Sequence, residues 1–564
     1  MICAEFGEIK APDFSVVPAE REEFGDYTSN VAMMLAKTLK KNPMEVARAL
    51  ASEMQTYIPE LIKRIDVAVP GFVNIHINDS AILAISNDVL KNPDTWGKSQ
   101  EGKDKTVILD YFQLNIAKKP HVGHLRSAVI GDALKRILHA RGYQTIADTH
   151  VGDWGTQFGI LLWAWKNRVS EKDKIIYQED PFKNLEKLYK VGNHEILRNP
   201  EVREFAKAEF AKLEQGDKEN RETWQWMVDI SMKKLEQSAT RLKLLAFEEH
   251  KGESAYENAM APIKEDALAK GVAKKTDDGA VIVDLTGKGL DEAVLIKSDG
   301  ASTYLLRDLA TIKYRKEKHN FWKNLYVVDN RQSHHFQQLF RVAELLGFEG
   351  VGASEHVQFG FMKLPEGAMS TRAGNTISLD AVLDEAEARA REVIRVKNPD
   401  LADADEVAKK VGLGAIKFFD LSHNRKSDVV FRWEDVLSFE GNTGPYIQYT
   451  YARIKSILRK SGEGKGEYIF SESVEMGSVE RNLMFSCTRL PEAMDRVIET
   501  WSPHLLATYL FELAQKANEF YHARPILSEE NEEKKQFLLS LVQAVATTLA
   551  TGLYLLGIDA PEEM

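Results

Sequence analysis

The stretch that decides the fold begins with Thr106-Val-Ile-Leu-Asp110 and ends with His121-Val-Gly-His124. Its first segment is short, apolar and rich in β-branched residues, which predicts a buried strand. After His124, apolar residues recur at helical spacing as far as Gly142, where a C-terminal cap is expected. Pro120 is placed in the first helical turn, which tolerates proline. We therefore predict a strand, a tight loop and a helix.

Two imidazoles, those of His121 and His124, would lie one turn apart at the N-terminus of this helix. Unpaired backbone N–H groups and the helix dipole make such an end a binding place for phosphate. Gly123 leaves room for a nucleotide, and the imidazoles can donate to phosphate oxygens. The pattern favours an ATP site. Paired histidines could instead bind a metal, and a four-residue match occurs by chance in many chains.

Composition indicates an ordinary globular protein. The 564 residues suffice for roughly three or four domains, and 44% are hydrophobic and 28% charged. No run approaches the ~20 apolar residues of a membrane span, and no signal peptide is evident at the N-terminus. Cys3 and Cys487 are too few for a disulfide framework or a cysteine zinc site, so a reducing cytoplasm is expected.

The net charge of −11 does not exclude a polyanionic partner, because attraction depends on local patches. From Tyr451 to Gly466 there are five basic residues against one acidic residue, and further tyrosines, Tyr446 and Tyr449, precede them. On charge alone this segment is more simply explained as a solvated amphipathic helix.

Three domains are expected along the chain. Residues 1–85 combine a helix pair with strands and form a small α+β domain. Over 100–440, strands and helices alternate as in a doubly wound α/β fold, with an insertion at about 160–300. Strand signals nearly vanish in 445–564, which predicts an all-α domain.

A wider string, Asn115-Ile-Ala-Lys118-Lys-Pro-His121-Val-Gly-His124-Leu-Arg-Ser, is followed by Gly152-Asp153-Trp154-Gly155-Thr-Gln-Phe-Gly159. Together they resemble the signature of arginyl-tRNA synthetases, a class I aminoacyl-tRNA synthetase family. The resemblance runs nearly end to end, through Gly444-Pro-Tyr446-Ile-Gln-Tyr449 to the closing Leu555-Leu-Gly-Ile-Asp-Ala-Pro-Glu-Glu-Met564. It implies a Rossmann-type catalytic domain, an N-terminal domain at the tRNA elbow and a C-terminal anticodon-binding domain.

The implied activity is ATP-dependent ligation of L-arginine to its tRNA through arginyl-adenylate, releasing AMP and pyrophosphate, in protein synthesis. ATP would bind together with Mg²⁺, and no metal held tightly by protein ligands is expected. No membrane partner is expected either, and the chain would be a cytoplasmic monomer. Neither step needs a covalent enzyme intermediate, so positioning and charge stabilisation should dominate. Two rivals are a small nucleotidylyltransferase, which shares the histidine loop, and a paralogue that binds RNA without catalysis.

For ATP, the resemblance implicates His121, Gly123 and His124, with the two histidines catalytic. Class I enzymes usually carry a second loop, Lys-Met-Ser-Lys-Ser, but here the stretch reads Ala368-Met369-Ser370-Thr371-Arg372. Both lysines are missing, although Met369, Ser370 and Arg372 could still meet ATP. Lys118 is the candidate for the missing cation. Activation that depends on bound tRNA is expected from the same resemblance.

Recognition of arginine demands carboxylates, because guanidinium is a permanent cation with five donors in a planar fork. Tyr304 and Asp308 lie four apart on a predicted helix and share one face; without the resemblance, a surface pair of Asp308 with Arg307 would be the simpler explanation. The family pattern adds further residues that would contact arginine: Asp110, Gln113, Leu114, Asn115, His124 and Gln332. Between Asp110 and Asn115 the family has small residues, so the role of this loop stays open.

For tRNA, aromatic and basic residues of the C-terminal part are implicated: Tyr449, Arg453, Trp501 and Tyr521. Unstacked anticodon bases stack on such aromatics, although a core stripe at helical spacing would explain most of them. Phe72, Asn74 and His76 alternate on one strand and are expected at the tRNA elbow.

Overall fold

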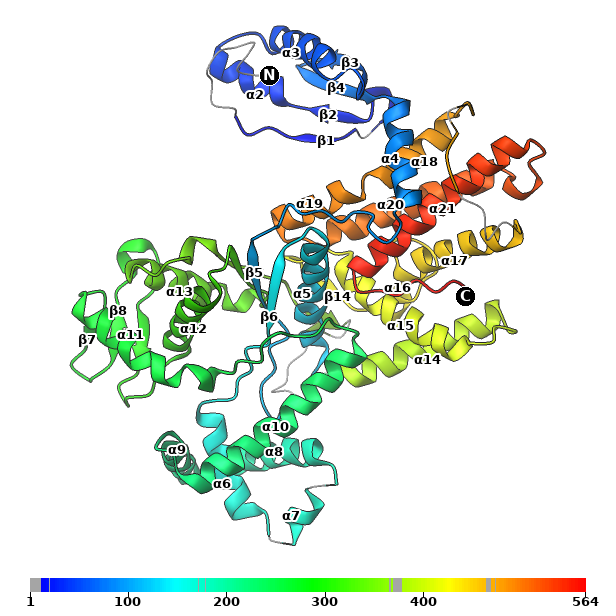
Figure 1. Ribbon diagram of the computed structural model, residues 1–564. Coiled ribbons are helices and arrows are strands. Elements are labelled where there is room, and N and C mark those ends of the chain that lie inside the picture. Colours follow the sequence, from blue (N-terminus) through cyan, green and yellow to red (C-terminus); the bar gives the residue numbers. More distant parts are fainter. Residues whose placement is uncertain are drawn as a thin grey trace. The chain divides into compact units, whose positions relative to one another are not determined.

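The computed structural model describes residues 12–19, 21–170, 172–177, 179–364, 367–368, 378–462, 468–471 and 473–564 (Figure 1). The chain forms two compact units. One contains residues 1–96, 454–490 and 513–548, and the other contains 97–453, 491–512 and 549–564. The predicted boundaries at 85, 100, 440 and 445 stay predictions.

Four parallel strands form the central sheet of the second unit, in the order β11-β10-β5-β6. Their bounds are Thr106–Asp110 for β5, Gln144–Asp148 for β6, Lys323–Tyr326 for β10 and Ser354–His356 for β11. The chain forms β5 and β6 before β10 and β11, so the strand order reverses between β5 and β10. Such a reversal is where open α/β sheets bind ligands. The predicted doubly wound fold is confirmed.

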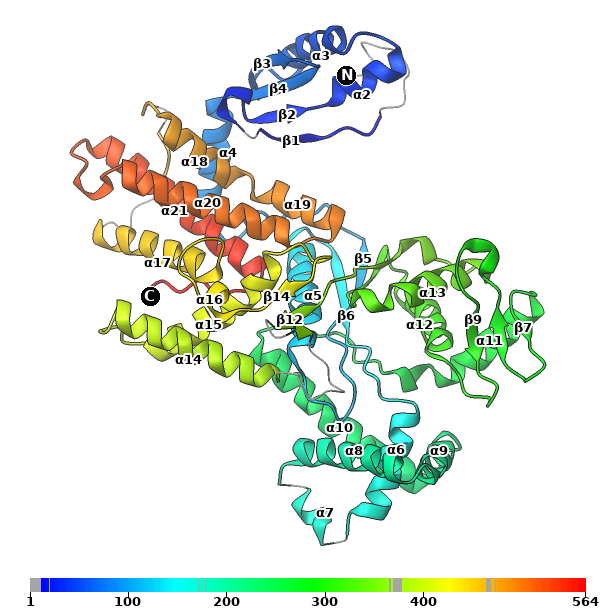
Figure 2. The ribbon, with the colours of Figure 1, turned by 180° about the vertical axis from the view of Figure 1, so that it is seen from behind.

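The helix after β5 is α5, Val122–Ala140, which leads to β6. Figure 2 shows α5 beside β6, with α15 (Ala404–Leu421) next to it. The helix begins at Val122, later than expected, because His121 is its N-cap and Pro120, which was expected in the first turn, precedes the cap. Gly142 follows the end of the helix with φ of 81°, the left-handed conformation that glycine adopts without strain.

Between β6 and β10 the chain is helical first and then contains a small sheet. The helices are α6 Thr156–Arg168, α7 Asp173–Ile176, α8 Pro181–Arg198, α9 Glu201–Glu214, α10 Lys218–Arg241 and α11 Glu257–Ala269. The sheet has the order β7-β8-β9, with bounds Lys274–Lys275, Val281–Val283 and Ala293–Ile296. Helix α12, Tyr304–His319, then packs on α11 and leads into β10. Helix α13, Ser333–Leu345, joins β10 to β11.

The N-terminal part is an antiparallel sheet in the order β1-β2-β4-β3, covered by a helix pair. Its strands are β1 Val16–Pro18, β2 Tyr27–Ser29, β3 Ile62–Ala68 and β4 Phe72–Ile77. Helices α2 Val31–Leu39 and α3 Pro43–Tyr57 bury Leu35 and Leu50 against it. Helix α4, Asp79–Lys91, follows and packs on α18, Ser478–Thr488.

From Gly444 onward the described chain contains helices and no strand, as predicted. The long helices are α17 Gly444–Lys460, α19 Leu490–Thr500, α20 His504–Ala523 and α21 Glu532–Leu555. Helix α14, Leu379–Lys397, packs on α15 ahead of them. Contrary to the sequence expectation, α21 is long and apolar enough to cross a membrane, but 78% of its most apolar window is buried inside the protein. It is a core helix.

A buried ion pair joins α5 to α15. Arg126 Nε lies 2.7 Å from Asp420 Oδ1, and their side chains are 1% and 0% exposed. Arg126 also donates to the carbonyl oxygens of Gly360 (2.7 Å) and Ser427 (2.9 Å). Because Arg126 is one turn after the histidine loop, this contact fixes the helix that carries the loop.

We expect Asp420→Ala to lower the free energy of unfolding by about 3–5 kcal/mol, because it leaves Arg126 buried without its counter-charge. Glu406→Ala is the control, since the Glu406–Lys409 pair is 65% and 51% exposed and such pairs contribute at most about 1 kcal/mol. Urea denaturation measures both. Equal effects of the two substitutions would contradict the importance of the buried pair.

Candidate active site

A cavity of about 980 Å³ opens at the point where the strand order reverses. It is lined by the loop after β5, the N-terminus of α5, the first turns of α12 and the loop after β10. Ten residues predicted for ATP and arginine line it: Asp110, Gln113, Leu114, Asn115, His121, Gly123, His124, Tyr304, Asp308 and Gln332. Met369, Ser370 and Arg372, also predicted for ATP, lie outside the described residues.

The two histidines cap α5 with their own rings. Nδ1 of His121 accepts a hydrogen bond from the Gly123 amide (3.1 Å), and Nδ1 of His124 accepts one from the His121 amide (3.1 Å). The rings lie 3.8 Å apart. A neutral imidazole that accepts at Nδ1 carries its proton on Nε2. Each ring is thus a donor at Nε2, and neither Nδ1 is free for a metal.

Both rings are held in the neutral form. Burial lowers the pKa of His124 to about 3, and the positive charge of Lys118 contributes. Burial also lowers the pKa of His121, helped by Arg331 and Lys118. At neutral pH the pair therefore acts through hydrogen bonds and not through charge. No group of three or more metal-ligating side chains exists among the described residues.

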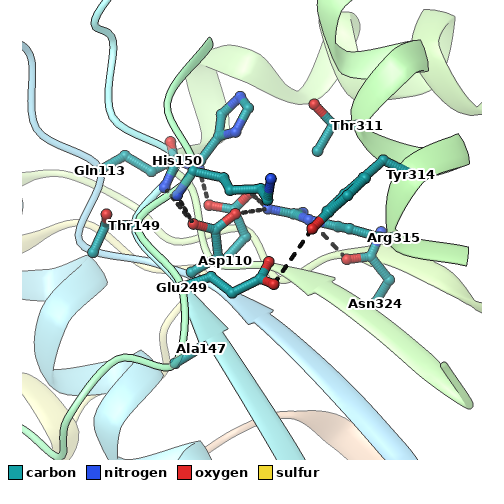
Figure 3. Close-up of polar contacts among 12 residues, drawn as sticks. Asp110, Gln113, Ala147, Thr149, His150, Glu249, Thr311, Tyr314, Arg315 and Asn324 are labelled. Carbon is teal, nitrogen blue, oxygen red and sulfur yellow. Dashed lines mark hydrogen bonds and ion pairs between the residues drawn. The ribbon is translucent and has the colours of Figure 1, made fainter. Parts of the chain in front are cut away.

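Asp110 is already paired within the protein. Arg315 Nη2 lies 2.7 Å from Asp110 Oδ2 and 2.9 Å from Asp148 Oδ2, and all three side chains are at most 1% exposed. Figure 3 shows Arg315 reaching from α12 to Asp110, with Gln113 donating to the same carboxylate. Asp110 lines the cavity as expected, but it shares Arg315 with Asp148, so its role toward an arginine substrate stays a prediction.

Asp308 is a second carboxylate of the cavity, and its neighbours are histidines and not an arginine. Tyr304 and Asp308 lie on one helix, α12, as predicted. Asp308 does not pair with Arg307, which instead binds Glu253 at 2.9 Å. His335 Nε2 lies 2.6 Å from Asp308 Oδ2, and His150 Nε2 lies 3.5 Å from Oδ1. Burial alone would raise the pKa of Asp308, but the two histidines hold it well below its usual range.

Several charged or titratable residues that the sequence analysis did not assign to the site also line the cavity, among them His150, Glu253, Arg331 and His335. His150 lies two residues before Gly152, where the quoted block begins, and this position could have pointed to it. Burial raises the pKa of Glu253 to about 7, although Arg307 opposes the shift. Glu253 is far from the others in sequence and carries no motif.

Three cations lie near the histidine pair. Lys118 Nζ is 5.6 Å from the centroid of the Tyr189 ring. Lys119 pairs with Glu186 at 3.5 Å. Arg331 is bound to Asp329 through Nε (3.0 Å) and Nη2 (2.8 Å). Lys118 lowers the pKa of both histidines, which places its charge close to the cap.

In the second unit, the residues predicted to contact tRNA differ in exposure: one is buried, and two reach the surface. Trp501 is 3% exposed and donates from Nε1 to Glu355 at 2.9 Å, so it is a core residue and has no ring surface for RNA. Tyr449 on α17 is 38% exposed, and Arg453 one turn later is partly buried.

In the first unit, Phe72 is 36% exposed, whereas Asn74 is buried and accepts a hydrogen bond from Thr28. His76 is bound to Asp66 at 2.8 Å. Phe72 is therefore the most exposed of the three predicted elbow residues, and His76 is partly exposed. Tyr521 on α20 is partly buried.

Known proteins match this chain along its whole length. Family models described as "tRNA synthetases class I (R), catalytic domain", "DALR anticodon binding domain" and "Arginyl tRNA synthetase N terminal domain" match residues 85–433, 447–564 and 2–77. The arginine–tRNA ligase of Fusobacterium nucleatum is 38% identical over 99% of this chain and 96% of its own. That of Clostridioides difficile is 39% identical, over 96% and 94%.

Solved structures agree. The arginyl-tRNA synthetase of Thermus thermophilus superposes with a TM-score of 0.81 at 29% identity, covering 98% of this chain and 96% of its own. That of Plasmodium falciparum gives 0.83 at 25% identity, covering 100% and 97%. This chain therefore belongs to the arginyl-tRNA synthetases, class I enzymes that ligate arginine to its tRNA.

Proposed function

We propose that this cavity forms arginyl-adenylate from ATP and arginine and then transfers the arginyl group to the terminal adenosine of tRNA. One observation carries the proposal: a neutral donor pair at a helix N-terminus and the Asp308 carboxylate line the same cavity. Phosphate binds the first, and a guanidinium binds the second.

The phosphates of ATP lie against the first turn of α5. Nε2 of His121 and of His124 donate to phosphate oxygens as negative charge moves toward pyrophosphate, a rearrangement that fixed donors stabilise. Gly123 carries no side chain to occupy this space. We propose Mg²⁺ as the companion of ATP, with Lys118 supplying the cation that the altered loop lacks.

Arginine enters with its guanidinium on Asp308. Tyr304 and Gln332 line the same end of the cavity, and Asn115 and His124 hold the α-amino and carboxylate groups. This arrangement puts the substrate carboxylate beside the phosphates. Positioning of two bound reactants supplies a large share of the rate enhancement in such reactions.

The decisive experiment is arginine-dependent exchange of pyrophosphate into ATP, with and without tRNA. We expect exchange with arginine only when tRNA is bound. A nucleotidylyltransferase would not depend on arginine, and a non-catalytic RNA-binding paralogue would give no exchange. We further propose a monomeric, cytoplasmic enzyme. Tyr449, Arg453, Tyr521 and Phe72 are the proposed tRNA contacts.

Asp308→Asn should raise the KM for arginine and leave that for ATP nearly unchanged. Loss of one partner of a desolvated charge pair costs roughly 2–5 kcal/mol. Steady-state aminoacylation measures both constants, and Asp400→Asn at an exposed position is the control. Equal effects on both substrates would remove Asp308 from the arginine pocket.

Lys118→Ala should slow adenylate formation, with a loss of roughly 3 kcal/mol of transition-state stabilisation, typical of one removed electrostatic group. Lys119→Ala is the matched control, because its charge is paired with Glu186. Rapid-quench kinetics with bound tRNA gives the rate. If Arg331→Ala or Arg372→Ala slows this step more than Lys118→Ala does, the assignment to Lys118 is wrong.

Tyr449→Ala should weaken tRNA binding by about 1–3 kcal/mol, the usual contribution of one base stacked on an aromatic ring. Filter binding of tRNA measures it, and the KM values for ATP and arginine should stay constant. Trp501→Ala should instead lower the melting temperature, because it removes a buried ring. A Tyr449→Ala variant with normal tRNA affinity would show that this ring only packs on the protein.

A further inference from the structure

Both oxygens of Asp308 face imidazoles. His335 Nε2 is at hydrogen-bond distance from Oδ2 (2.6 Å), and His150 Nε2 stands 3.5 Å from Oδ1. The Asp308 side chain is 19% exposed, and all three residues line the cavity. A guanidinium that binds this carboxylate through two parallel hydrogen bonds needs the same two oxygens. The histidines and the substrate therefore compete.

His150 is held in its place at a cost. Its φ is 36°, a left-handed conformation that non-glycine residues adopt rarely and usually at functional sites. Its Nδ1 is buried and has no hydrogen-bond partner among the described residues. Neither feature is required by the β6 strand that ends two residues earlier. Both suit a ring that is aimed at Asp308.

The groups facing His150 are mostly acidic and come from several elements: Asp110, Asp148, Asp153, Glu253 and Asp308, together with the cation Arg315. Burial works against a charged ring, but the carboxylates of Asp308 and Asp110 raise the pKa of His150 to about 9. In the protein without arginine, His150 is therefore largely protonated at neutral pH and neutralises Asp308.

We propose that His150 and His335 are specificity-determining residues of the arginine pocket: they hold Asp308 in the empty site, and the guanidinium of arginine replaces them with release of a proton. The inference rests on the proposed function, in which Asp308 binds the guanidinium. The exchange is balanced, since one permanent cation enters and one imidazolium becomes imidazole by giving its proton to solvent. A ligand without a strong planar cation cannot displace the histidines.

The sign of the pH dependence follows. A proton bound to His150 opposes arginine, so arginine affinity rises as pH rises toward the pKa of His150 in the empty site. Glu253 adds a second source, because its pKa is about 7 and an incoming cation favours its ionised form. Glu253 releases its proton on arginine binding mainly below neutral pH, whereas His150 also releases one above neutral pH. The two contributions can therefore be told apart by pH.

The test is isothermal titration calorimetry of the full-length protein with L-arginine, between pH 6 and 8, in buffers of different ionisation enthalpy. Above neutral pH we expect about one proton released per arginine and a Kd that falls up to about tenfold per pH unit; toward pH 6 the release should be larger, because Glu253 adds to it. His150→Gln keeps an N–H donor for Asp308 but cannot become charged. It should release fewer protons and bind arginine more tightly than the unaltered protein at pH 6. Titration of the substrate itself is the same in both proteins and cancels.

His334→Gln is the matched control, because His334 is half exposed and does not line the cavity; it should keep the full proton release. Glu253→Gln should remove only the additional proton release below neutral pH and leave the release from His150 unchanged. If the unaltered protein gives the same binding enthalpy in every buffer, no proton is released on binding, and the proposal is overturned. Unchanged proton release in His150→Gln would overturn it as well. If Asp308→Asn binds arginine normally, the proposed function itself fails, a result distinct from these.

Discussion

The guanidinium of Arg315, buried between Asp110 and Asp148, is the interaction on which the active site depends. It reaches from α12 and ties the carboxyl ends of β5 and β6 together (Figure 3). The same helix carries Tyr304 and Asp308 at its start. Charges buried this deeply are tolerated only when each has its partner, and loss of one typically costs about 3–5 kcal/mol. The position of Asp308 relative to the sheet is thus set by this contact, because Asp308 lies seven positions before Arg315 on the same helix.

The phosphate side of the site depends on a different principle, which is the suppression of charge. In each histidine of the loop, Nδ1 accepts a hydrogen bond from a backbone amide, and burial keeps both rings neutral. Their Nε2 donors need no rearrangement when charge develops on the phosphates. The cavity therefore has two opposite ends. One offers neutral donors for an anion, and the other offers a carboxylate for a cation.

Local patterns predicted the parts of the fold that local physics decides. The strand β5 and the helix α5 were predicted almost to the residue, because apolar periodicity and a terminal glycine mark them. The contact of Asp110 with Arg315 could not be predicted, because the two residues are 205 positions apart and no spacing rule connects them. Trp501 fits an RNA-stacking pattern and a core pattern equally well, and only its burial decides. His150, His335 and Glu253 are brought to Asp308 by the fold alone.

A crystal structure of the protein with bound arginine tests the central claim most directly. The account predicts the substrate guanidinium within hydrogen-bond distance, about 3 Å, of both oxygens of Asp308. The Asp110–Arg315 contact should remain intact, and the rings of His150 and His335 should have moved off Asp308. A guanidinium bound to Asp110 with Arg315 displaced, and Asp308 still held by both histidines, would contradict it.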